Sequence, residues 1–349
     1  MHSERFPEDW LFWVRSKIEG KLAAFRYRRD LWHQELVPHL PQKKHTPYVF
    51  VHIPKTAGTS FRKALEQRFG WPMVLCDYGL KEGRSSSFVR FKLSNSSVGE
   101  LRKELCSFRV ICGHIGLQKY LKLSGLPCCL TFVREPLQRS FSAYQHARRL
   151  QGYQGTLKEY VAKQGDLQTK LLSGLPLEAL AFVGIGERYF DSLQLLKAQF
   201  PDLELEEFRE NVNEVKLDEF YQFNSEEEQL LREHNQQDLQ LYEKAKRLFE
   251  ERLDANRHGV EYHRGGIQSS QPNLVSGWLA GNSYPPEIKA VYEGQVVARA
   301  KAFEFRPGLA CWGIEREGFV GFSLRSNEID LQKCTVQLDD PTQRILLPL

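Results

Sequence analysis

Between residues 48 and 253 the chain repeats one pattern of apolar and polar positions. A short, nearly continuous apolar run is followed by a turn and then by a stretch with apolar residues three or four positions apart, as at Phe61, Leu65 and Phe69. Four such runs lie at 48–53, 108–112, 129–133 and 181–186. They are rich in β-branched and aromatic residues, which is typical of strands buried on both faces. The alternation predicts an α/β fold with a parallel sheet covered by helices.

Capping patterns indicate where several helices begin. Thr156 with Glu159, and Ser225 with Glu228, have the spacing of a capping box. The second pair predicts the start of one long helix that continues to about residue 249. Residues 71–100 show no helical or strand period, and we expect surface loops there.

After about Asp254 the pattern changes from helical spacing to alternation. Residues 257–273 are polar and bear glycines, which is typical of a linker. Alternating apolar positions on both sides of Glu293-Gly294 predict a β-hairpin, and further short strands predict a small all-β sandwich. The predicted division is a helical lead-in over 1–46, an α/β domain over 47–256, a linker over 257–273 and a β-sandwich over 274–349.

Length and composition exclude some classes of protein, such as highly basic nucleic-acid-binding proteins. A chain of 349 residues suits one large domain with a small one. Its 48 Lys and Arg against 44 Asp and Glu give a net charge of +4, too mild to imply nucleic-acid binding. No apolar segment is long enough to predict a transmembrane span. The odd number of cysteines, seven, without a C-x-x-C pair, predicts buried reduced thiols in a cytoplasmic protein.

The residues after the first predicted strand have the composition of an anion-binding loop. Pro54 ends the strand, and Lys55, Thr56, Ala57, Gly58, Thr59 and Ser60 lead into a helix. Converging backbone N–H groups, the helix dipole and the lysine would together bind a phosphate. The lysine precedes the glycine, so the order differs from the G-x-x-x-x-G-K-[ST] loop of nucleotide triphosphatases. The alternative is an ordinary turn between strand and helix.

A second candidate phosphate site follows the third predicted strand. Arg134 ends that strand, and Ser142 lies eight residues later in a helix predicted over about 137–150. A guanidinium can bind a phosphate with two hydrogen bonds, and a serine hydroxyl can donate a third. The alternative is an arginine in a surface salt bridge. Arg139, five residues after Arg134, is expected to be structural or to make a secondary contact.

His114 is the candidate general base, because it follows a glycine at the end of the second predicted strand. A purely structural histidine is the alternative. His52 lies inside the first strand and is expected to be buried between strands. The carboxyl ends of parallel strands meet at one edge of a sheet, where ligands bind. Lys55, His114 and Arg134 are therefore expected at the same edge.

The order K-T-A-G-T-S after an H-I-P strand, together with R-E-P and its serine, resembles the two nucleotide signatures of PAPS-dependent carbohydrate sulfotransferases. The similarity is greatest to the branch of the heparan sulfate 2-O- and 6-O-sulfotransferases and their bacterial relatives, and it spans about residues 47–253. It implies a P-loop-like sulfotransferase fold, with residues 55–60 at the 5′-phosphosulfate and Arg134 with Ser142 at the 3′-phosphate. A Q-T-K-L-L segment implies that Lys170 approaches the nucleotide. The chain departs from the family pattern at Ala57, Glu135 and Lys170.

The resemblance implies an O-sulfotransferase that moves a sulfuryl group from PAPS to a carbohydrate hydroxyl, with His114 and Lys55 as catalytic residues. PAP, adenosine 3′,5′-bisphosphate, would be the product, and no metal is expected. The expected acceptor is a bacterial surface or secreted polysaccharide, and a cytoplasmic location follows from the lack of an N-terminal anchor. The β-sandwich resembles modules appended to bacterial glycan-modifying enzymes. The alternatives are an ATP-dependent phosphotransferase and a non-catalytic glycan-binding protein.

Overall fold

The computed structural model describes every residue except 1–45, 81–82, 204, 206–219 and 282–283. The predicted helical lead-in therefore lies almost wholly outside the described residues. In the described part, no helix is both long and apolar enough to span a membrane.

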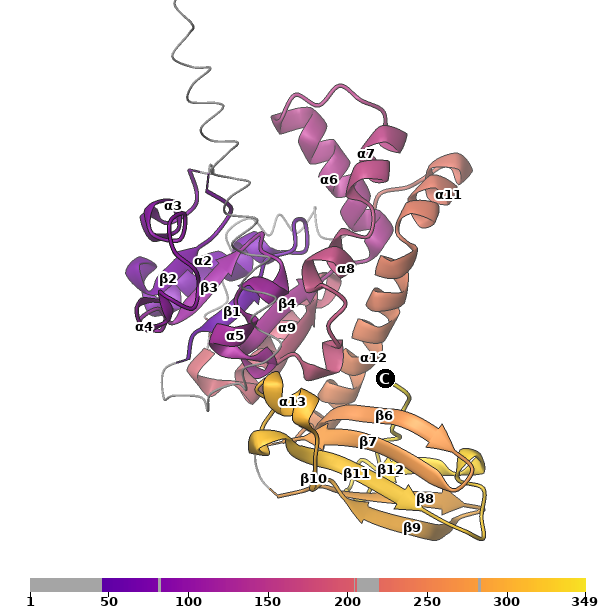
Figure 1. Ribbon diagram of the computed structural model, residues 1–349. Coiled ribbons are helices and arrows are strands. Elements are labelled where there is room, and N and C mark those ends of the chain that lie inside the picture. Colours follow the sequence, from indigo (N-terminus) through magenta and orange to yellow (C-terminus); the bar gives the residue numbers. More distant parts are fainter. Residues whose placement is uncertain (1–45, 81–82, 204, 206–219, 282–283) are drawn as a thin grey trace, which may run out of the picture.

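Five parallel strands form the central sheet, in the order β2-β3-β1-β4-β5 (Figure 1). They are β1 (Tyr48–Val51), β2 (Val74–Cys76), β3 (Val110–Gly113), β4 (Cys129–Val133) and β5 (Phe182–Ile185). The central strand, β1, pairs with β3 and β4, so that Val51 lies between Gly113 and Thr131. The predicted α/β architecture with a parallel sheet is confirmed.

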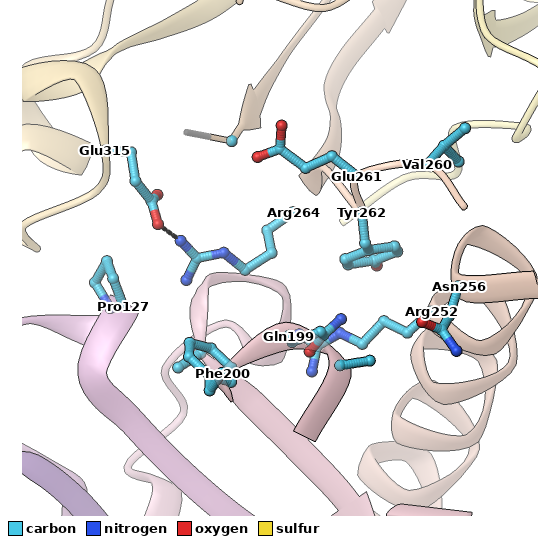
Figure 2. Close-up of a pocket in the computed structure, with 13 residues that line it drawn as sticks. Pro127, Gln199, Phe200, Arg252, Asn256, Val260, Glu261, Tyr262, Arg264 and Glu315 are labelled. Atoms are coloured by element: carbon cyan, nitrogen blue, oxygen red, sulfur yellow. Dashed lines mark ion pairs between the residues drawn. The ribbon is translucent and has the colours of Figure 1, made fainter. Parts of the chain in front are cut away.

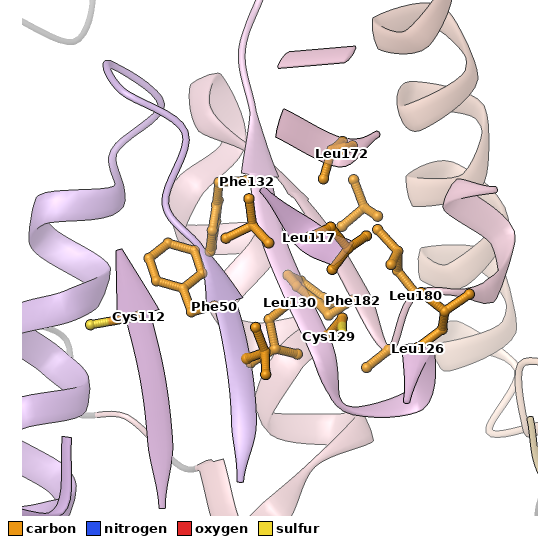
Figure 3. Packing of buried hydrophobic residues seen from close by; sticks show 14 of the residues in the cluster. Phe50, Cys112, Leu117, Leu126, Cys129, Leu130, Phe132, Leu172, Leu180 and Phe182 are labelled. Atoms are coloured by element: carbon orange, nitrogen blue, oxygen red, sulfur yellow. The ribbon is translucent and has the colours of Figure 1, made fainter. Parts of the chain in front are cut away.

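Helices surround this sheet and complete its core (Figure 1). They are α2 (Gly58–Phe69), α3 (Ser87–Phe91), α4 (Arg102–Leu105), α5 (Leu121–Ser124), α6 (Pro136–Leu150), α7 (Leu157–Gln164), α8 (Leu167–Leu172), α9 (Tyr189–Gln199), α11 (Ser225–His234) and α12 (Gln236–Arg257). Phe61 of α2 packs against Phe50 and Phe132, at ring-centre distances of 4.6 and 4.9 Å. Figure 3 shows this aromatic and aliphatic core around β1 and β4. Burial of this core stabilises β1 and β4, and so holds in place the strand ends that carry the candidate site.

The prediction of loops over residues 71–100 was wrong in part. Strand β2 and helix α3 lie in this stretch, and β2 extends the sheet at the edge of β3. All three residues of β2 are buried. A strand of three residues is too short to show a period in the sequence.

The predicted long helix from Ser225 is two helices, α11 and α12, separated at Asn235. The buried Asn235 side chain donates to the carbonyl of Leu231 at the end of α11 and accepts from the Ser140 hydroxyl on α6. These side-chain bonds compete with the backbone bonds that would continue the helix. The capping box that starts α11 uses Asn224 and Glu227, one residue earlier than predicted. The predicted capping box at the start of α7 is confirmed.

The C-terminal region is antiparallel. One sheet has the order β10-β11-β7-β6 and the other β12-β8-β9. The elements are β6 (Arg264–Gln271), β7 (Leu274–Ala280), β8 (Glu287–Tyr292), β9 (Gln295–Lys301), β10 (Glu304–Phe305), α13 (Pro307–Cys311), β11 (Phe319–Arg325) and β12 (Thr335–Leu338). Side chains from both sheets, among them Leu279, Phe322 and Ile288, share one buried cluster. The hairpin predicted around residues 293–294 is confirmed as β8 and β9.

The prediction of a linker over residues 257–273 was wrong, because residues 264–271 form β6. The glycines that suggested a linker allow a close approach instead. A Cβ atom at Gly265, whose φ is +129°, would lie 2.0 Å from the carbonyl oxygen of Trp278. Glycine at such a position permits strand pairing rather than marking a flexible segment.

The antiparallel region packs directly on the α/β region. Trp278 and Ala280 belong to the same buried cluster as the central sheet. Arg344 Nε lies 2.8 Å from Glu251 Oε2 on α12, so an ion pair also joins the two regions.

The seven cysteines are thiols without disulfide bonds, as the sequence predicted. Not all of them are buried, however. Cys311 at the end of α13 is exposed, and Cys106 and Cys334 are half-buried. The expectation of buried thiols therefore holds for the four residues in or beside strands, Cys76, Cys112, Cys128 and Cys129.

Candidate anion-binding and catalytic site

The loop between β1 and α2 presents a run of backbone donors. Lys55 and Ala57 have left-handed backbone conformations, with φ values of 72° and 67°. Among the described residues, no backbone or side-chain acceptor binds the N–H groups of residues 55–59. The buried Thr56 hydroxyl donates to the carbonyl of Ile53 at 2.8 Å and so holds the turn. Successive unpaired N–H groups at a helix N-terminus are suited to bind an anion.

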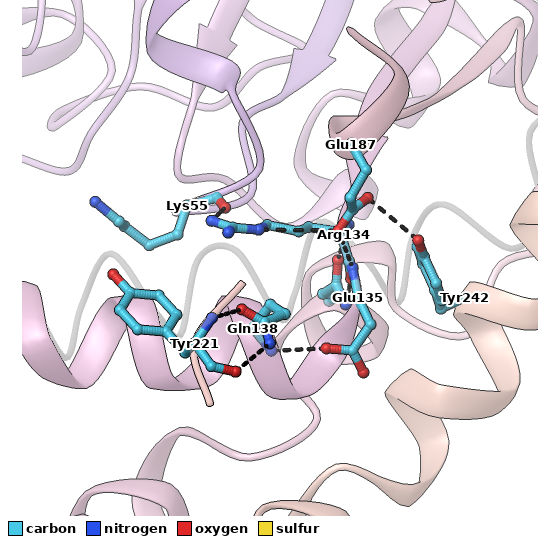
Figure 4. A network of polar contacts seen from close by, with 8 residues as sticks. Lys55, Arg134, Glu135, Gln138, Glu187, Tyr221 and Tyr242 are labelled. Atoms are coloured by element: carbon cyan, nitrogen blue, oxygen red, sulfur yellow. Dashed lines mark hydrogen bonds and ion pairs between the residues drawn. The ribbon is translucent and has the colours of Figure 1, made fainter. Parts of the chain in front are cut away.

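Arg134 joins this loop from the adjacent strand. Its Nη1 atom donates to the Lys55 carbonyl at 3.3 Å (Figure 4). Its Nε atom lies 3.9 Å from Glu187 Oε1. Its backbone is held by Gln168, which accepts from the Arg134 N–H at 3.0 Å and donates to its carbonyl at 2.9 Å. Arg134 is therefore fixed on both its backbone and its side chain beside Lys55.

Positive charge accumulates around the loop. Burial lowers the pKa of Lys55, and the neighbouring Arg134 and Arg149 lower it further. Burial, Lys55 and Arg149 likewise lower the pKa of His146 on α6. Cations from the loop, from the end of β4 and from α6 therefore repel one another. A bound polyanion would relieve this repulsion.

Two histidines and a tyrosine lie beside the loop. The His114 ring packs edge-on against His52 and Tyr78, with ring centres 4.8 Å away in both cases. His52 Nδ1 lies 3.0 Å from the Tyr78 hydroxyl oxygen. A Cβ atom at Gly58 would lie 2.0 Å from Cδ2 of His52, so the absence of a side chain at Gly58 lets His52 pack against the start of α2. His52 is buried between strands, as predicted, with its N–H bound to Gly113.

Both histidines are neutral near pH 7. Burial lowers the pKa of His52 to about 3, and His114 and Arg62 contribute further to this shift. Burial and the nearby Arg84 lower the pKa of His114 to about 4. Arg84 itself lies over the Tyr78 ring, 5.0 Å from its centre. Part of the His114 residue reaches solvent although its ring is largely covered, so it is accessible to a ligand, whereas His52 is enclosed.

The other residues predicted for the site lie on helices α2, α6 and α8. Thr59 and Ser60 are in the first turn of α2. Ser142 is buried on α6, and its hydroxyl has no hydrogen-bonding partner among the described residues. Lys170 Nζ instead donates to the Gly165 carbonyl at 2.5 Å, so its contact caps the end of α7. Arg139 is fully buried and donates to Ser140, which agrees with the expected structural role.

Sequence reasoning missed Tyr78 and the two hydrogen bonds between Gln138 and Tyr221. Tyr78 follows β2 at the same sheet edge as His114, and recognition of β2 would have placed it there. Gln138 donates to the Tyr221 carbonyl at 3.0 Å and accepts from its N–H at 2.8 Å (Figure 4). These residues are 83 positions apart, and no local pattern predicts such a contact.

A search of protein-family models found no match to the chain, and a search of curated proteins found none either. Within the described residues, no group of three or more His, Cys, Asp or Glu side chains is placed to hold a metal ion.

Proposed function

We propose that the chain is a PAPS-dependent O-sulfotransferase that moves a sulfuryl group to a carbohydrate hydroxyl. The observation that carries the proposal is the junction of the loop at residues 55–59 with Arg134. Five consecutive N–H groups without acceptors among the described residues adjoin two cations at one end of a parallel sheet. Such a site suits a ligand with several phosphate or sulfate groups. The proposal extends to the P-loop-like fold of that enzyme family.

The residues present fit the two ends of the donor. The amides of residues 55–59 and the Lys55 ammonium would hold the 5′-phosphosulfate. Arg134 and the Ser142 hydroxyl would hold the 3′-phosphate, which distinguishes PAPS from ADP and ATP. Ser142 has a hydroxyl available for this bond, because no described residue engages it. Lys170 would need to leave the Gly165 carbonyl before it could reach a nucleotide.

The chemistry assigned to the chain is proton transfer and charge stabilisation. In the reaction, an acceptor hydroxyl oxygen forms a bond to sulfur as the bond from sulfur to the bridging phosphate oxygen breaks. His114 takes the hydroxyl proton. Its lowered pKa keeps the ring unprotonated at neutral pH but also makes it a weaker base than an ordinary histidine. Lys55 and the loop amides stabilise the negative charge that develops on the leaving oxygen. The product of the donor is PAP.

Calorimetry with PAP and with ADP tests the donor assignment. PAP is expected to bind about tenfold or more tightly than ADP, because only PAP carries the 3′-phosphate assigned to Arg134. Equal affinity for the two nucleotides would contradict the assignment.

Transfer of labelled sulfate from PAPS to a panel of polysaccharides tests the reaction itself. His114→Ala is the matched variant, since it removes the proposed base and leaves the loop intact. Its rate is expected to fall by about 10²–10⁴-fold while PAP affinity is retained. A rate equal to that of the unchanged chain would remove His114 from the mechanism.

A further inference from the structure

A cavity of about 510 Å³ lies between the α/β region and the antiparallel region. Its walls include Pro127 and Ala181, which precede β4 and β5, and residues of α9, α12 and β6. Lys55 and Arg134 follow the carboxyl ends of β1 and β4, whereas Pro127 and Ala181 precede the amino ends of their strands. The cavity and the candidate PAPS site are therefore at opposite edges of the sheet.

Arg252 of α12 lines this cavity and is left with unpaired donors. Its side chain is 1% exposed. Its Nη2 atom donates to the Leu180 carbonyl at 3.2 Å, but its Nε and Nη1 atoms have no hydrogen-bonding partner among the described residues. The guanidinium lies 5.1 Å from the centre of the Tyr262 ring. The nearest negative charge, Glu251, also pairs with Arg344, and Tyr262 is a neutral neighbour. A further anion would therefore stabilise the buried guanidinium.

Two other arginines near the cavity are paired with carboxylates, and the exposed carboxylate of Glu261 also lines the cavity. Arg264 forms an ion pair with Glu315 (Figure 2). Arg344, which also lies over the Tyr262 ring, pairs with Glu251. These carboxylates are therefore engaged by other arginines. Arg252 is the cation that an incoming anion would neutralise.

The cavity also offers neutral polar and aromatic groups. The Arg252 guanidinium points across the cavity toward the Gln199 side chain, and Asn256 lies one turn along α12 (Figure 2). Phe200 and Tyr262 supply apolar ring surface. The volume lies within the range of about 300–1,000 Å³ that is usual for small-molecule sites.

We propose that this cavity binds a small polar molecule through a single oxyanion group, a carboxylate, sulfate or phosphate, which pairs with Arg252. The side-chain amides of Gln199 and Asn256 bind neutral polar groups of the same molecule, and the aromatic rings contact its apolar face. The site is separate from the candidate PAPS site and does not depend on the function proposed for that site.

Gln199→Glu tests the proposal without removing the buried arginine. The substitution keeps the size of the half-buried side chain and places a carboxylate opposite Arg252, where it competes with an external anion. Gln194→Glu is the matched control, because it makes the same change at an exposed position of α9 that does not line the cavity. Ala198→Trp is a second variant that fills the cavity from an exposed position.

The full-length chain is titrated by calorimetry with sodium sulfate, sodium glucuronate and glucose. Sulfate and glucuronate are expected to bind, and glucose to bind at least about tenfold more weakly than glucuronate, since it lacks the charged group. Gln199→Glu and Ala198→Trp should each weaken anion binding about tenfold or more, and Gln194→Glu should not. If sulfate binds but glucuronate does not, the site holds an inorganic oxyanion rather than a sugar acid.

Lys55→Ala separates this site from the candidate PAPS site. Anion binding in the cavity should persist in Lys55→Ala and be lost in Gln199→Glu. The proposal is overturned if neither anion binds to the unchanged chain, or if Lys55→Ala abolishes binding that Gln199→Glu leaves intact. Equal binding of glucose and glucuronate would also overturn it.

Discussion

Arg134 and Lys55 are joined directly, because Nη1 of Arg134 donates a hydrogen bond to the backbone carbonyl of Lys55 over 3.3 Å. The bond connects the ends of two neighbouring strands, β4 and β1. It places the guanidinium beside the loop whose backbone N–H groups, at residues 55–59, have no acceptor among the described residues. The two phosphate-binding features predicted separately from the sequence are thus parts of one site.

Arg134→Lys should weaken PAP binding by about 10- to 100-fold. The substitution keeps the positive charge but removes the planar fork, whose fixed geometry allows it to bond the loop carbonyl and a phosphate together. Calorimetry measures the loss. Arg257→Lys, at the exposed end of α12, is the control and should bind PAP as the unchanged chain does. Unaltered binding by Arg134→Lys would show that the fork makes no contact with the ligand.

Ala57→Gly should leave the free energy of unfolding unchanged or raise it by up to about 1 kcal/mol. Ala57 has a φ of 67°, where a side chain is strained, and glycine removes this strain. Glycine also gives the unfolded chain more conformational entropy, and the relief of strain offsets this loss of stability. Ala162→Gly, at an exposed interior position of α7, should instead lower stability by about 1 kcal/mol. Urea unfolding compares the two; equal losses would mean that Ala57 is not strained.

Gly58→Ala should destabilise the chain by about 1–3 kcal/mol, since the added methyl group would meet the His52 ring. The combination with His52→Ala removes that ring. The double variant should therefore lose less stability than the two single losses together, by about 1 kcal/mol or more. Strictly additive losses in chemical denaturation would argue against contact between the two residues.

The rate of sulfate transfer should stay level down to about pH 5 and fall as the pH approaches 4. As the proposed base, His114 must be unprotonated, and burial together with Arg84 lowers its pKa to about 4. Arg84→Gln removes part of this effect, so its rate should begin to fall at a higher pH. An inflection near pH 6.5 in the unchanged chain would contradict the lowered pKa.

This pH profile has to be corrected for unfolding. The folded-state pKa values of His52 and His114 lie below the ordinary value of 6.5, so protonation favours the unfolded chain. The stability that these neutral rings contribute is complete above pH 6.5 and declines as the pH falls toward 4 and 3. Circular dichroism at each pH gives the folded fraction by which the rate is divided.

The sequence was sufficient to predict the strands that carry Lys55, His114 and Arg134. Each of these strands is an apolar run of at least four residues that ends at a polar residue, and parallel pairing then places the ends together. Strand β2 has only three residues and escaped detection. Tyr78 follows β2, so it could not be placed at the sheet edge from the sequence either.

Other features depend on contacts between distant segments and leave no local pattern. The break at Asn235 arises from a bond to Ser140, and β6 is extended by pairing with β7 although its glycines are typical of a linker. The position of Lys170 Nζ depends on where α7 ends. Arg252 has the helical spacing of an ordinary α12 residue, and only the packed antiparallel region shows that its charge is buried.

The central place of β1 in the sheet has a consequence for hydrogen–deuterium exchange. Backbone groups of β1 are bonded to β3 on one side and to β4 on the other, whereas β2 and β5 have only one neighbouring strand each. Opening of β1 therefore requires both halves of the sheet to separate, and its amides should exchange among the slowest in the α/β region. The candidate anion-binding loop is thus attached to the part of the sheet that opens most rarely.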